Sequence, residues 1–341
     1  MDRIMKDLEE TIEKKDRFSF LSGKRVLVTG ATGLIGSALI KTIRAADSRW
    51  NLNISVIGQI RDSEKAKKVF GEDADAVRFV TDTRHACDYI VHTASPTSST
   101  FFVEHPVETI RSSVGGTMEA LEAAKDYQAV MVYLSSMEQY GVPEEKGQVM
   151  TEDRIGRIDH LNIRSSYSES KRLCECLCAS YVSEYGTDVR IARLAQTFGA
   201  GALLTDNRMP MQFARAAAAG KDIVLHTEGK SISNFVYLTD AVAGILAILE
   251  KGTPGEAYNV CNDKETRSVR EIAELIAGEV SGNRIRVRVE IPETDCGYAP
   301  DVSMYLDSGK LRRLGWEARV DMREAYLRLI RYIRENAAGK A

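Results

Sequence analysis

Short apolar runs alternate along the chain with longer segments in which apolar residues recur at helical spacing. Runs of four to six residues that are rich in Val and Ile are typical of buried strands. They lie at 25–29, 54–57, 77–80, 89–92, 130–134, 189–194 and 257–260. Because strands that alternate with helices pair in parallel and are covered on both faces, the pattern predicts an α/β fold with a Rossmann-like, doubly wound parallel sheet. In such a sheet, ligands bind beyond the carboxyl ends of the strands.

The alternation is interrupted after residue 200, which predicts a second structural unit. With 341 residues, the chain exceeds the roughly 250 to 300 that one hydrophobic core usually serves. We assign 24–200 to the sheet domain, to which 235–262 returns, and we assign 201–234 and 263–341 to a smaller C-terminal lobe. Helical patterns in this lobe lie at 208–220, 268–280 and 321–337. Residues 1–23 are highly charged and are expected to form an N-terminal appendage.

Composition and charge exclude several classes of partner. The chain has 46 Lys and Arg against 49 Asp and Glu, and its net charge of -3 offers no electrostatic attraction to nucleic acid or to an anionic membrane. No apolar run approaches the ~18 residues of a membrane helix. The first twenty residues lack the apolar core of a secretory signal, so we expect a cytoplasmic protein.

Six cysteines, at 87, 174, 176, 178, 261 and 296, are too few to staple a chain of this length. Cys174, Cys176 and Cys178 are spaced like a cluster of metal ligands. On a helix, however, the middle side chain points away from the other two, and no histidine is suitably spaced nearby. We therefore predict reduced thiols and no metal site.

A glycine-rich turn joins the first strand to the first helix. Gly30, Gly33 and Gly36 follow the strand at 25–29, and the pattern becomes helical from Leu34. Glycine lets the backbone turn sharply and approach a pyrophosphate, while a helix N-terminus offers free N–H donors to an anion. A strand before the turn and a helix after it therefore predict a dinucleotide cradle. Its expected cofactor contacts are Gly30, Thr32, Gly33, Leu34, Ile35 and Gly36.

The end of the second strand bears on which dinucleotide fits. An NAD-binding chain usually has an acidic residue there, which accepts hydrogen bonds from the adenosine ribose. Here Ile60 takes that place and Arg61 follows, and an arginine can pair with the 2′-phosphate of NADP. Asp62 keeps NAD possible, so these residues leave the choice open. Further cofactor contacts are expected at Arg61, Asp82, Thr83, Thr93, Ala94, Ser95 and Leu194.

Tyr167 and Lys171 form the candidate catalytic pair. They are four residues apart in a helical pattern and so share one helix face. A free phenol has a pKa of about 10, and a neighbouring ammonium favours its ionised form, which makes proton transfer at neutral pH feasible. Ser136 follows the strand at 130–134 and can donate to the substrate oxygen that Tyr167 deprotonates. Glu138 is a second acid or base on the same loop.

Across residues 24–335, a series of motifs resembles the extended short-chain dehydrogenase/reductases, specifically the nucleotide-sugar epimerase, dehydratase and decarboxylase group. The motifs are TGATGLIGS, HTAS, SSMEQYG, RSSYSESKR, RLAQTFG, NFVYLTDA, EAYNV and LGWE, in the order of the family. RSSYSESKR is most similar to the UDP-glucuronate decarboxylases.

The resemblance implies an NAD-dependent enzyme that oxidises a nucleotide sugar at C4. By this resemblance Tyr167 takes the proton of the 4-hydroxyl, and hydride passes from C4 to the nicotinamide and then returns, so the cofactor is recycled. The family also implies a homodimer, built from the helix that starts at Tyr167 and the helix near 105–125. Expected substrate contacts are Ser95, Ser136, Gln196, Asn207 and Arg215.

Two departures from the family pattern bear on the outcome of the reaction. Met137 replaces an aspartate of the 4,6-dehydratases, so epimerisation or decarboxylation is favoured over loss of water. Ser233 replaces an arginine that holds the diphosphate, and Arg208, Arg215 or Lys230 are candidates to substitute for it. Two alternatives stay open. One is an NADPH-dependent ketoreductase of a 4-keto sugar nucleotide or another small carbonyl, and the other is a catalytically idle dinucleotide-binding module.

Overall fold

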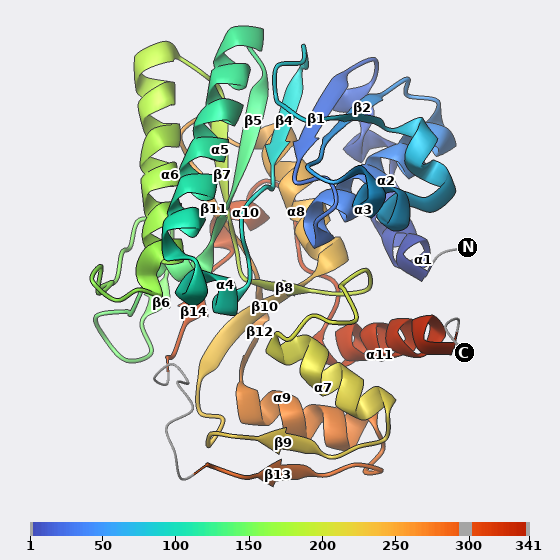
Figure 1. Cartoon of the computed structure of the whole chain (residues 1–341), viewed down its shortest axis with the longest axis vertical. Helices are drawn as coiled ribbons and strands as arrows, with labels where there is room; N and C mark the ends of the chain where they lie inside the picture. Colours follow the sequence, from blue (N-terminus) through green and yellow to red (C-terminus); the bar gives the residue numbers. More distant parts are fainter. Residues whose placement is uncertain (1–2, 293–301, 339–341) are drawn as a thin grey trace.

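Seven parallel strands form the central sheet of the computed structural model, which describes residues 3–292 and 302–338 (Figure 1). Their order is β11-β7-β5-β4-β1-β2-β3, so the chain starts in the middle of the sheet, moves to one edge and then crosses to the other. All seven predicted strands lie in this sheet, which confirms the Rossmann-like doubly wound fold. Their bounds are β1 Arg25–Thr29, β2 Ser55–Gln59, β3 Arg78–Val80, β4 Tyr89–His92, β5 Val130–Ser136, β7 Val189–Leu194 and β11 Ala257–Val260.

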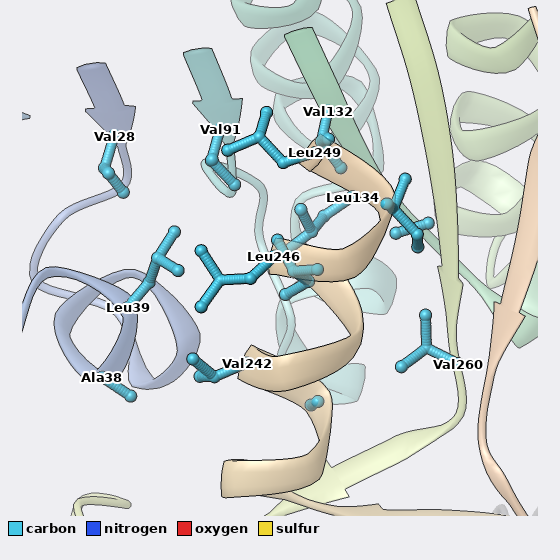
Figure 2. Close-up of a cluster of buried hydrophobic side chains, with 14 of the residues drawn as sticks. Val28, Ala38, Leu39, Val91, Val132, Leu134, Val242, Leu246, Leu249 and Val260 are labelled. Carbon is cyan, nitrogen blue, oxygen red and sulfur yellow. The ribbon is translucent and has the colours of Figure 1, made fainter. Parts of the chain in front are cut away.

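Helices cover both faces of the sheet. α2 (Leu34–Trp50) and α8 (Leu238–Lys251) lie on one face, where Leu249 of α8 packs beside strand residues such as Val132 (Figure 2). α5 (Pro106–Tyr127) and α6 (Ser165–Tyr185) cover the opposite face over a separate apolar cluster. Within the described part of the chain, no helix is long and apolar enough to cross a membrane. Because both faces are covered, the polar residues that end the strands are the ones placed to meet a ligand.

A second, three-stranded sheet connects the central sheet to the smaller lobe (Figure 1). It consists of β8 (Gln196–Phe198), β10 (Ile232–Tyr237) and β12 (Asn262–Ser268), in the order β12-β10-β8. Tyr237 and Phe235 of β10 face an apolar cluster that belongs to the smaller lobe. The lobe therefore has a core of its own, separate from the two cores of the sheet domain.

The three helical patterns predicted for the smaller lobe are present. They form α7 (Met209–Ala218), α9 (Val269–Leu275) and α11 (Met322–Ala338), and a π-helical turn extends α9 to Val280. The lobe also contains β9 (Ile223–Leu225) paired with β13 (Val287–Val289), which the pattern does not predict. Strands of three residues are too short to show a measurable alternation.

The N-terminal segment packs across both lobes. α1 (Arg3–Glu9) lies beside α2 of the sheet domain and also contacts α11 of the smaller lobe. The Tyr237 hydroxyl donates to Asp7 Oδ2 at 2.5 Å. Glu10 forms an ion pair with Arg328 of α11 at 2.8 Å. The buried side chains of the segment include Leu8, Thr11 and Ile12.

The three closely spaced cysteines lie on α6, as their spacing predicts. Cys174 and Cys178 are buried, whereas Cys176 between them is exposed, which confirms that the middle side chain points away from the other two. Cys87 and Cys261 are buried thiols elsewhere in the fold, and Cys296 lies outside the described residues. Burial raises the pKa of Cys87 to about 12, so this thiol is unreactive at neutral pH.

Candidate active site

The turn between β1 and α2 forms a tight cradle at the carboxyl end of the sheet. Gly30 has a φ of +64°, and an added Cβ there would lie 2.8 Å from Thr93 Oγ1. A Cβ on Gly36 would lie 2.4 Å from the Gly30 carbonyl oxygen, which is too close for a real contact. Gly33 precedes α2 without a side-chain cap. This arrangement fits a dinucleotide, because the backbone can approach a pyrophosphate and the first N–H groups of α2 can donate to it.

A hydrogen-bond chain through His92 braces the neighbouring turn. Thr29 Oγ1 accepts from the Ala94 N–H at 3.2 Å, so its own hydrogen is directed to His92 Nδ1 at 2.8 Å. Thr117 Oγ1 donates to the Ser113 carbonyl at 2.8 Å and therefore accepts from His92 Nε2 at 3.2 Å. Burial, together with the charge of Lys171, lowers the pKa of His92 to about 3. The imidazole is thus neutral and fixed in one tautomer.

The residues after β2 show which groups can meet the adenosine ribose. Ile60 is buried in the core, so this position offers no polar contact. Asp62 Oδ1 accepts from the Lys65 N–H at 3.0 Å and caps α3 (Ser63–Phe70). Arg61 is exposed and has no hydrogen bond or ion pair with the residues that the structure describes. Arg61 is therefore fully available to a cofactor, and Asp62 keeps its second oxygen, Oδ2, available, so both NAD and NADP stay possible.

Asp82 and Thr83 follow β3 and lie against α5. Asp82 Oδ1 accepts from the Arg84 N–H at 2.8 Å and stays exposed, whereas the buried Thr83 hydroxyl donates to the Glu119 carbonyl at 3.1 Å. Both border a surface groove of about 720 Å³ between this loop and α5, which includes none of the catalytic residues. The hydroxyl of Thr83 is thus used by the fold, while the Asp82 carboxylate keeps free capacity.

Ser95 and Leu194 lie at the carboxyl edge of the sheet, where a nicotinamide is expected. Ser95 follows β4, and its Oγ is 3.4 Å from Ser113 Oγ on α5. Leu194 ends β7 and is paired in register with Ser136 at the end of β5. The structure therefore brings these two predicted contacts to the same edge as the candidate catalytic serine.

Tyr167 and Lys171 are buried in the first two turns of α6. Lys171 Nζ donates to the Leu134 carbonyl at 2.8 Å and lies 5.7 Å from the centre of the Tyr167 ring. Burial lowers the pKa of Lys171 to about 8, so its ammonium persists at neutral pH. Burial raises the pKa of Tyr167, the Glu138 charge adds to this effect, and a hydrogen bond with Ser136 opposes it. The pKa of the Tyr167 phenol therefore lies above its ordinary value in the protein alone, and not below it as the sequence predicts, because burial disfavours the phenolate.

Ser136 and Glu138 continue from β5 directly into the site. Ser136 Oγ accepts from the Glu138 N–H at 3.2 Å and starts the 3₁₀ turn Met137–Tyr140. Burial raises the pKa of Glu138, and the nearby Arg164 opposes the rise. Arg164 Nη2 is 3.5 Å from Glu138 Oε2. Glu138 can therefore hold a proton at higher pH than a solvated carboxylate and exchange it with a ligand.

An aromatic stack covers the catalytic phenol. The rings of Phe102 and Tyr167 lie 4.3 Å apart and are nearly parallel, at 7°. Phe102 belongs to α4 (Ser99–Glu104), a short helix that Ser98 caps. The sequence does not predict this contact, since no spacing rule connects α4 to α6. The stack holds the phenol in one position and excludes water from one of its faces.

Met137 and Ser233, the two residues that depart from the family pattern, are in contact on the substrate side of the site. Ser233 Oγ of β10 lies 3.8 Å from Met137 Sδ. An arginine and an aspartate are thus replaced by a small hydroxyl and a thioether in mutual contact. Gln196, a predicted substrate contact, is exposed at the start of β8.

The cations suggested in place of an arginine at Ser233 are used by the fold. Arg208 pairs with Asp206 at 2.7 Å, and Lys230 pairs with Glu228. Arg215 donates to the carbonyls of Leu204 and Asp206 and also contacts Asn207 Oδ1 at 3.4 Å, so these two predicted substrate contacts hold one loop. Of the three cations, Arg208 is the one whose charge reaches Tyr167 and lowers the pKa of its phenol. Substrate roles for Arg215 and Asn207 stay predictions.

A dinucleotide cradle at a sheet edge that also carries a buried Tyr–Lys pair is the arrangement of the extended short-chain dehydrogenase/reductases, the class of enzyme that this fold and site define. Residues 26–261 match the NAD dependent epimerase/dehydratase family. The chain belongs to this family and is an NAD(P)-dependent enzyme.

Comparison with individual proteins shows which members of the family this chain resembles. The chain is 31% identical to UDP-glucuronic acid decarboxylase 6 of Arabidopsis thaliana, over 89% of this chain and 87% of that protein. It is 28% identical to UDP-glucuronic acid decarboxylase 1 of Xenopus tropicalis, over 97% and 75%. Among solved structures, UDP-glucose 4-epimerase of Thermotoga maritima has the same fold, with a TM-score of 0.76, 21% identity and coverage of 92% and 99%.

Proposed function

We propose that the protein decarboxylates UDP-glucuronate through transient oxidation at C4. When bound, the nicotinamide cofactor supplies a reversible hydride acceptor for C4. The resulting 4-ketone makes the C5–C6 bond labile, so the carboxylate leaves as carbon dioxide and its bonding electrons pass to C5. A proton then adds at C5, hydride returns to C4, and a UDP-pentose is released. The observation that carries the proposal is the buried Tyr167, held between Lys171 and the Ser136–Glu138 turn.

Each residue has a defined task in this scheme. Tyr167 takes the proton from the 4-hydroxyl during oxidation and gives it back during reduction. Lys171 supplies a fixed positive charge beside the phenol, and Ser136 donates to the same sugar oxygen. Glu138 supplies the proton to C5, which its raised pKa makes feasible. The cofactor is regenerated in every turnover.

The test is incubation of the purified protein with UDP-glucuronate, with product analysis by mass spectrometry. We expect a UDP-pentose, carbon dioxide and no net change in nicotinamide absorbance. Tyr167→Phe should reduce the rate by about 10² to 10⁴-fold. Tyr185→Phe, at the exposed end of the same helix, is the matched control and should retain full activity. Release of carbon dioxide at an unchanged rate from Tyr167→Phe would rule out the proposed role of the phenol.

NAD is the proposed cofactor, in agreement with the family and with a reaction that recycles it. The free guanidinium of Arg61 favours a second candidate, a ketoreductase that consumes NADPH. Mass spectrometry of the dinucleotide released on denaturation distinguishes the two, and stoichiometric loss of NADPH absorbance with a 4-keto substrate supports the second. An idle binding module would retain the dinucleotide and convert no sugar.

We also propose a homodimer through α5 and α6, which pack side by side. Their outer faces carry exposed apolar residues at Val107, Ile110, Met118 and Leu173. Exposed apolar patches of this kind are typical of contact surfaces. Ile110→Asp should shift the molar mass measured by light scattering from dimer to monomer, whereas Val289→Asp, at an exposed site of the smaller lobe, should leave it unchanged.

A further inference from the structure

Arg164 is the N-cap residue of α6, has helical backbone angles, and precedes the catalytic pair on the same face. Arg164, Tyr167 and Lys171 follow at intervals of three and four residues, which places their side chains in one row along the helix. Lys171 lies toward the interior, where it binds the Leu134 carbonyl. Arg164 lies at the other end of the row, beside Glu138. The phenol is therefore placed between two cations, of which the mechanism above uses one.

The guanidinium of Arg164 has donors that the described residues do not use. Its Nη1 is buried and has no hydrogen-bond partner. Its Nη2 lies 3.5 Å from Glu138 Oε2, which is longer than the ~2.7–2.9 Å of a charge-assisted hydrogen bond. Because an unpaired buried donor is costly, a guanidinium in this state favours the arrival of an acceptor. The acceptor that fits a planar fork best is a carboxylate or a phosphate.

Other arginines around the site do not offer the same capacity. Their side chains already hold the loops that form the cleft. Arg172 donates to the Gln139, Tyr140 and Gly156 carbonyls, Arg193 to Glu175, Arg208 to Asp206, and Arg215 to the Leu204 and Asp206 carbonyls. These bonds are 2.6–3.0 Å long. Arg164 differs from these four arginines in two ways: its contact with Glu138 is long, and its Nη1 has no hydrogen-bond partner.

The geometry of a hexose decides which anionic group of the substrate reaches Arg164. If O4 lies at the Tyr167 hydroxyl, C6 is attached to the neighbouring ring carbon, whereas the diphosphate is attached at C1 across the ring. Helix residues three apart have Cβ atoms about 5–6 Å apart, so Arg164 is placed to reach a group adjacent to O4. A carboxylate at C6 is such a group, and the diphosphate is not.

We propose that Arg164 binds the C6 carboxylate of a uronate substrate through its free Nη1 edge and so selects UDP-uronates over neutral UDP-hexoses. The inference rests on the proposed function, because it takes O4 to be held at Tyr167. Glu138 is the present neighbour of Arg164, and on binding it shares the guanidinium with the substrate carboxylate. Arg164 is thereby a specificity residue in addition to the four catalytic ones.

The test is calorimetric titration of the NAD-loaded Tyr167→Phe protein, in which the sugar is bound without being consumed. Three ligands are compared: UDP-glucuronate, UDP-glucose and UDP. Arg164→Met should weaken UDP-glucuronate about 30-fold, as expected for loss of a charge-assisted bond, and leave the other two within about twofold. Arg164→Lys should give an intermediate loss for UDP-glucuronate alone. Arg154→Met, at an exposed position of the loop before α6, is the matched control and should bind all three ligands normally.

The outcomes separate this inference from the function on which it rests. An equal loss for all three ligands would assign Arg164 to the diphosphate and overturn the proposal, as would an unchanged affinity of Arg164→Met for UDP-glucuronate. Arg164→Lys keeps the test valid if Arg164→Met fails to fold, which its melting temperature reveals. If the unmodified enzyme binds UDP-glucuronate without releasing carbon dioxide, the proposed function fails while the selectivity of Arg164 still stands. If it binds none of the three, both fail.

Discussion

On the cofactor side of Tyr167, Thr29, His92 and Thr117 form an unbroken hydrogen-bond chain, whereas on the substrate side Arg164 keeps a buried donor without a partner. The same contrast holds for weaker contacts. Among the described residues, the hydrogen-bond partners of Ser233 Oγ are the Asn234 carbonyl at 3.5 Å and Met137 Sδ at 3.8 Å, both at long distance. The hydrogen-bond chain through His92 is complete without a ligand, whereas the polar groups of Arg164 and Ser233 are not fully paired.

The difference predicts how substitutions on each side affect stability and activity. A region whose polar groups are paired within the protein contributes to folding, so substitutions there alter stability as well as activity. A region with unused donors contributes little to folding and acts mainly when a ligand supplies the missing partner. Three predictions follow this contrast from the largest expected effect to the smallest.

Lys171 should show the largest effect, in the pH dependence of stability. Its pKa falls from 10.5 in the unfolded chain to about 8 when folded, so the unfolded chain binds more protons between these values. The free energy of unfolding contributed by this group therefore rises with pH across that window, by about 3 kcal/mol. We expect the native protein to gain this amount relative to Lys171→Met between pH 7.5 and about 10.5.

Urea unfolding of both proteins across the pH range measures this difference, and the other titrating groups cancel in the comparison. Lys146→Met, at an exposed site, is the control and should follow the native curve. A parallel curve for Lys171→Met would show that the ammonium is not desolvated in the folded protein.

Gly36→Ala should damage the cofactor side by overpacking. The new Cβ would lie 2.4 Å from the Gly30 carbonyl, so the cradle must open. We expect a loss of about 2 kcal/mol in stability, a typical cost of overpacking, together with a marked loss of dinucleotide affinity. Gly278→Ala in the smaller lobe is the matched control, because its Cβ would meet no atom closer than 3.9 Å. Thermal melts with and without dinucleotide measure both effects, and equal melts for the two variants would contradict a closed cradle.

The smallest effect compares one hydroxyl from each side. Thr117→Val removes the acceptor of His92 Nε2–H in the buried chain and should cost about 1–2 kcal/mol. Ser233→Ala removes only long contacts on the substrate side and should cost less than about 0.5 kcal/mol. Denaturant midpoints of the two variants provide the comparison. Similar losses would show that the two sides do not differ in their contribution to folding.

The fold and the cofactor side could be predicted from the sequence because both depend on backbone geometry. Apolar runs mark the seven strands, and the glycines at 30 and 36 mark places where no Cβ fits. The pair Tyr167 and Lys171 is recognisable because both residues lie on one helix at a fixed spacing. These features can be recognised from residues that are close together in the sequence.

The substrate side cannot be predicted in this way, because its contacts join elements that are distant in the chain. Phe102 reaches Tyr167 from α4, and Ser233 reaches Met137 from β10. The direction of the Tyr167 pKa shift was likewise out of reach, since spacing reveals a neighbouring charge but not the depth of burial. By contrast, the sequence does predict that Arg164 and Tyr167 lie on one face, because they are three residues apart in a helical pattern.

The ion pair between Glu10 and Arg328 joins residues 318 positions apart. It connects the N-terminal segment, which packs on α2 of the sheet domain, to α11 of the smaller lobe. Such long-range closure is slow compared with the formation of local helices. We therefore expect the contact that this segment makes between the two lobes to form later than the helices that it joins.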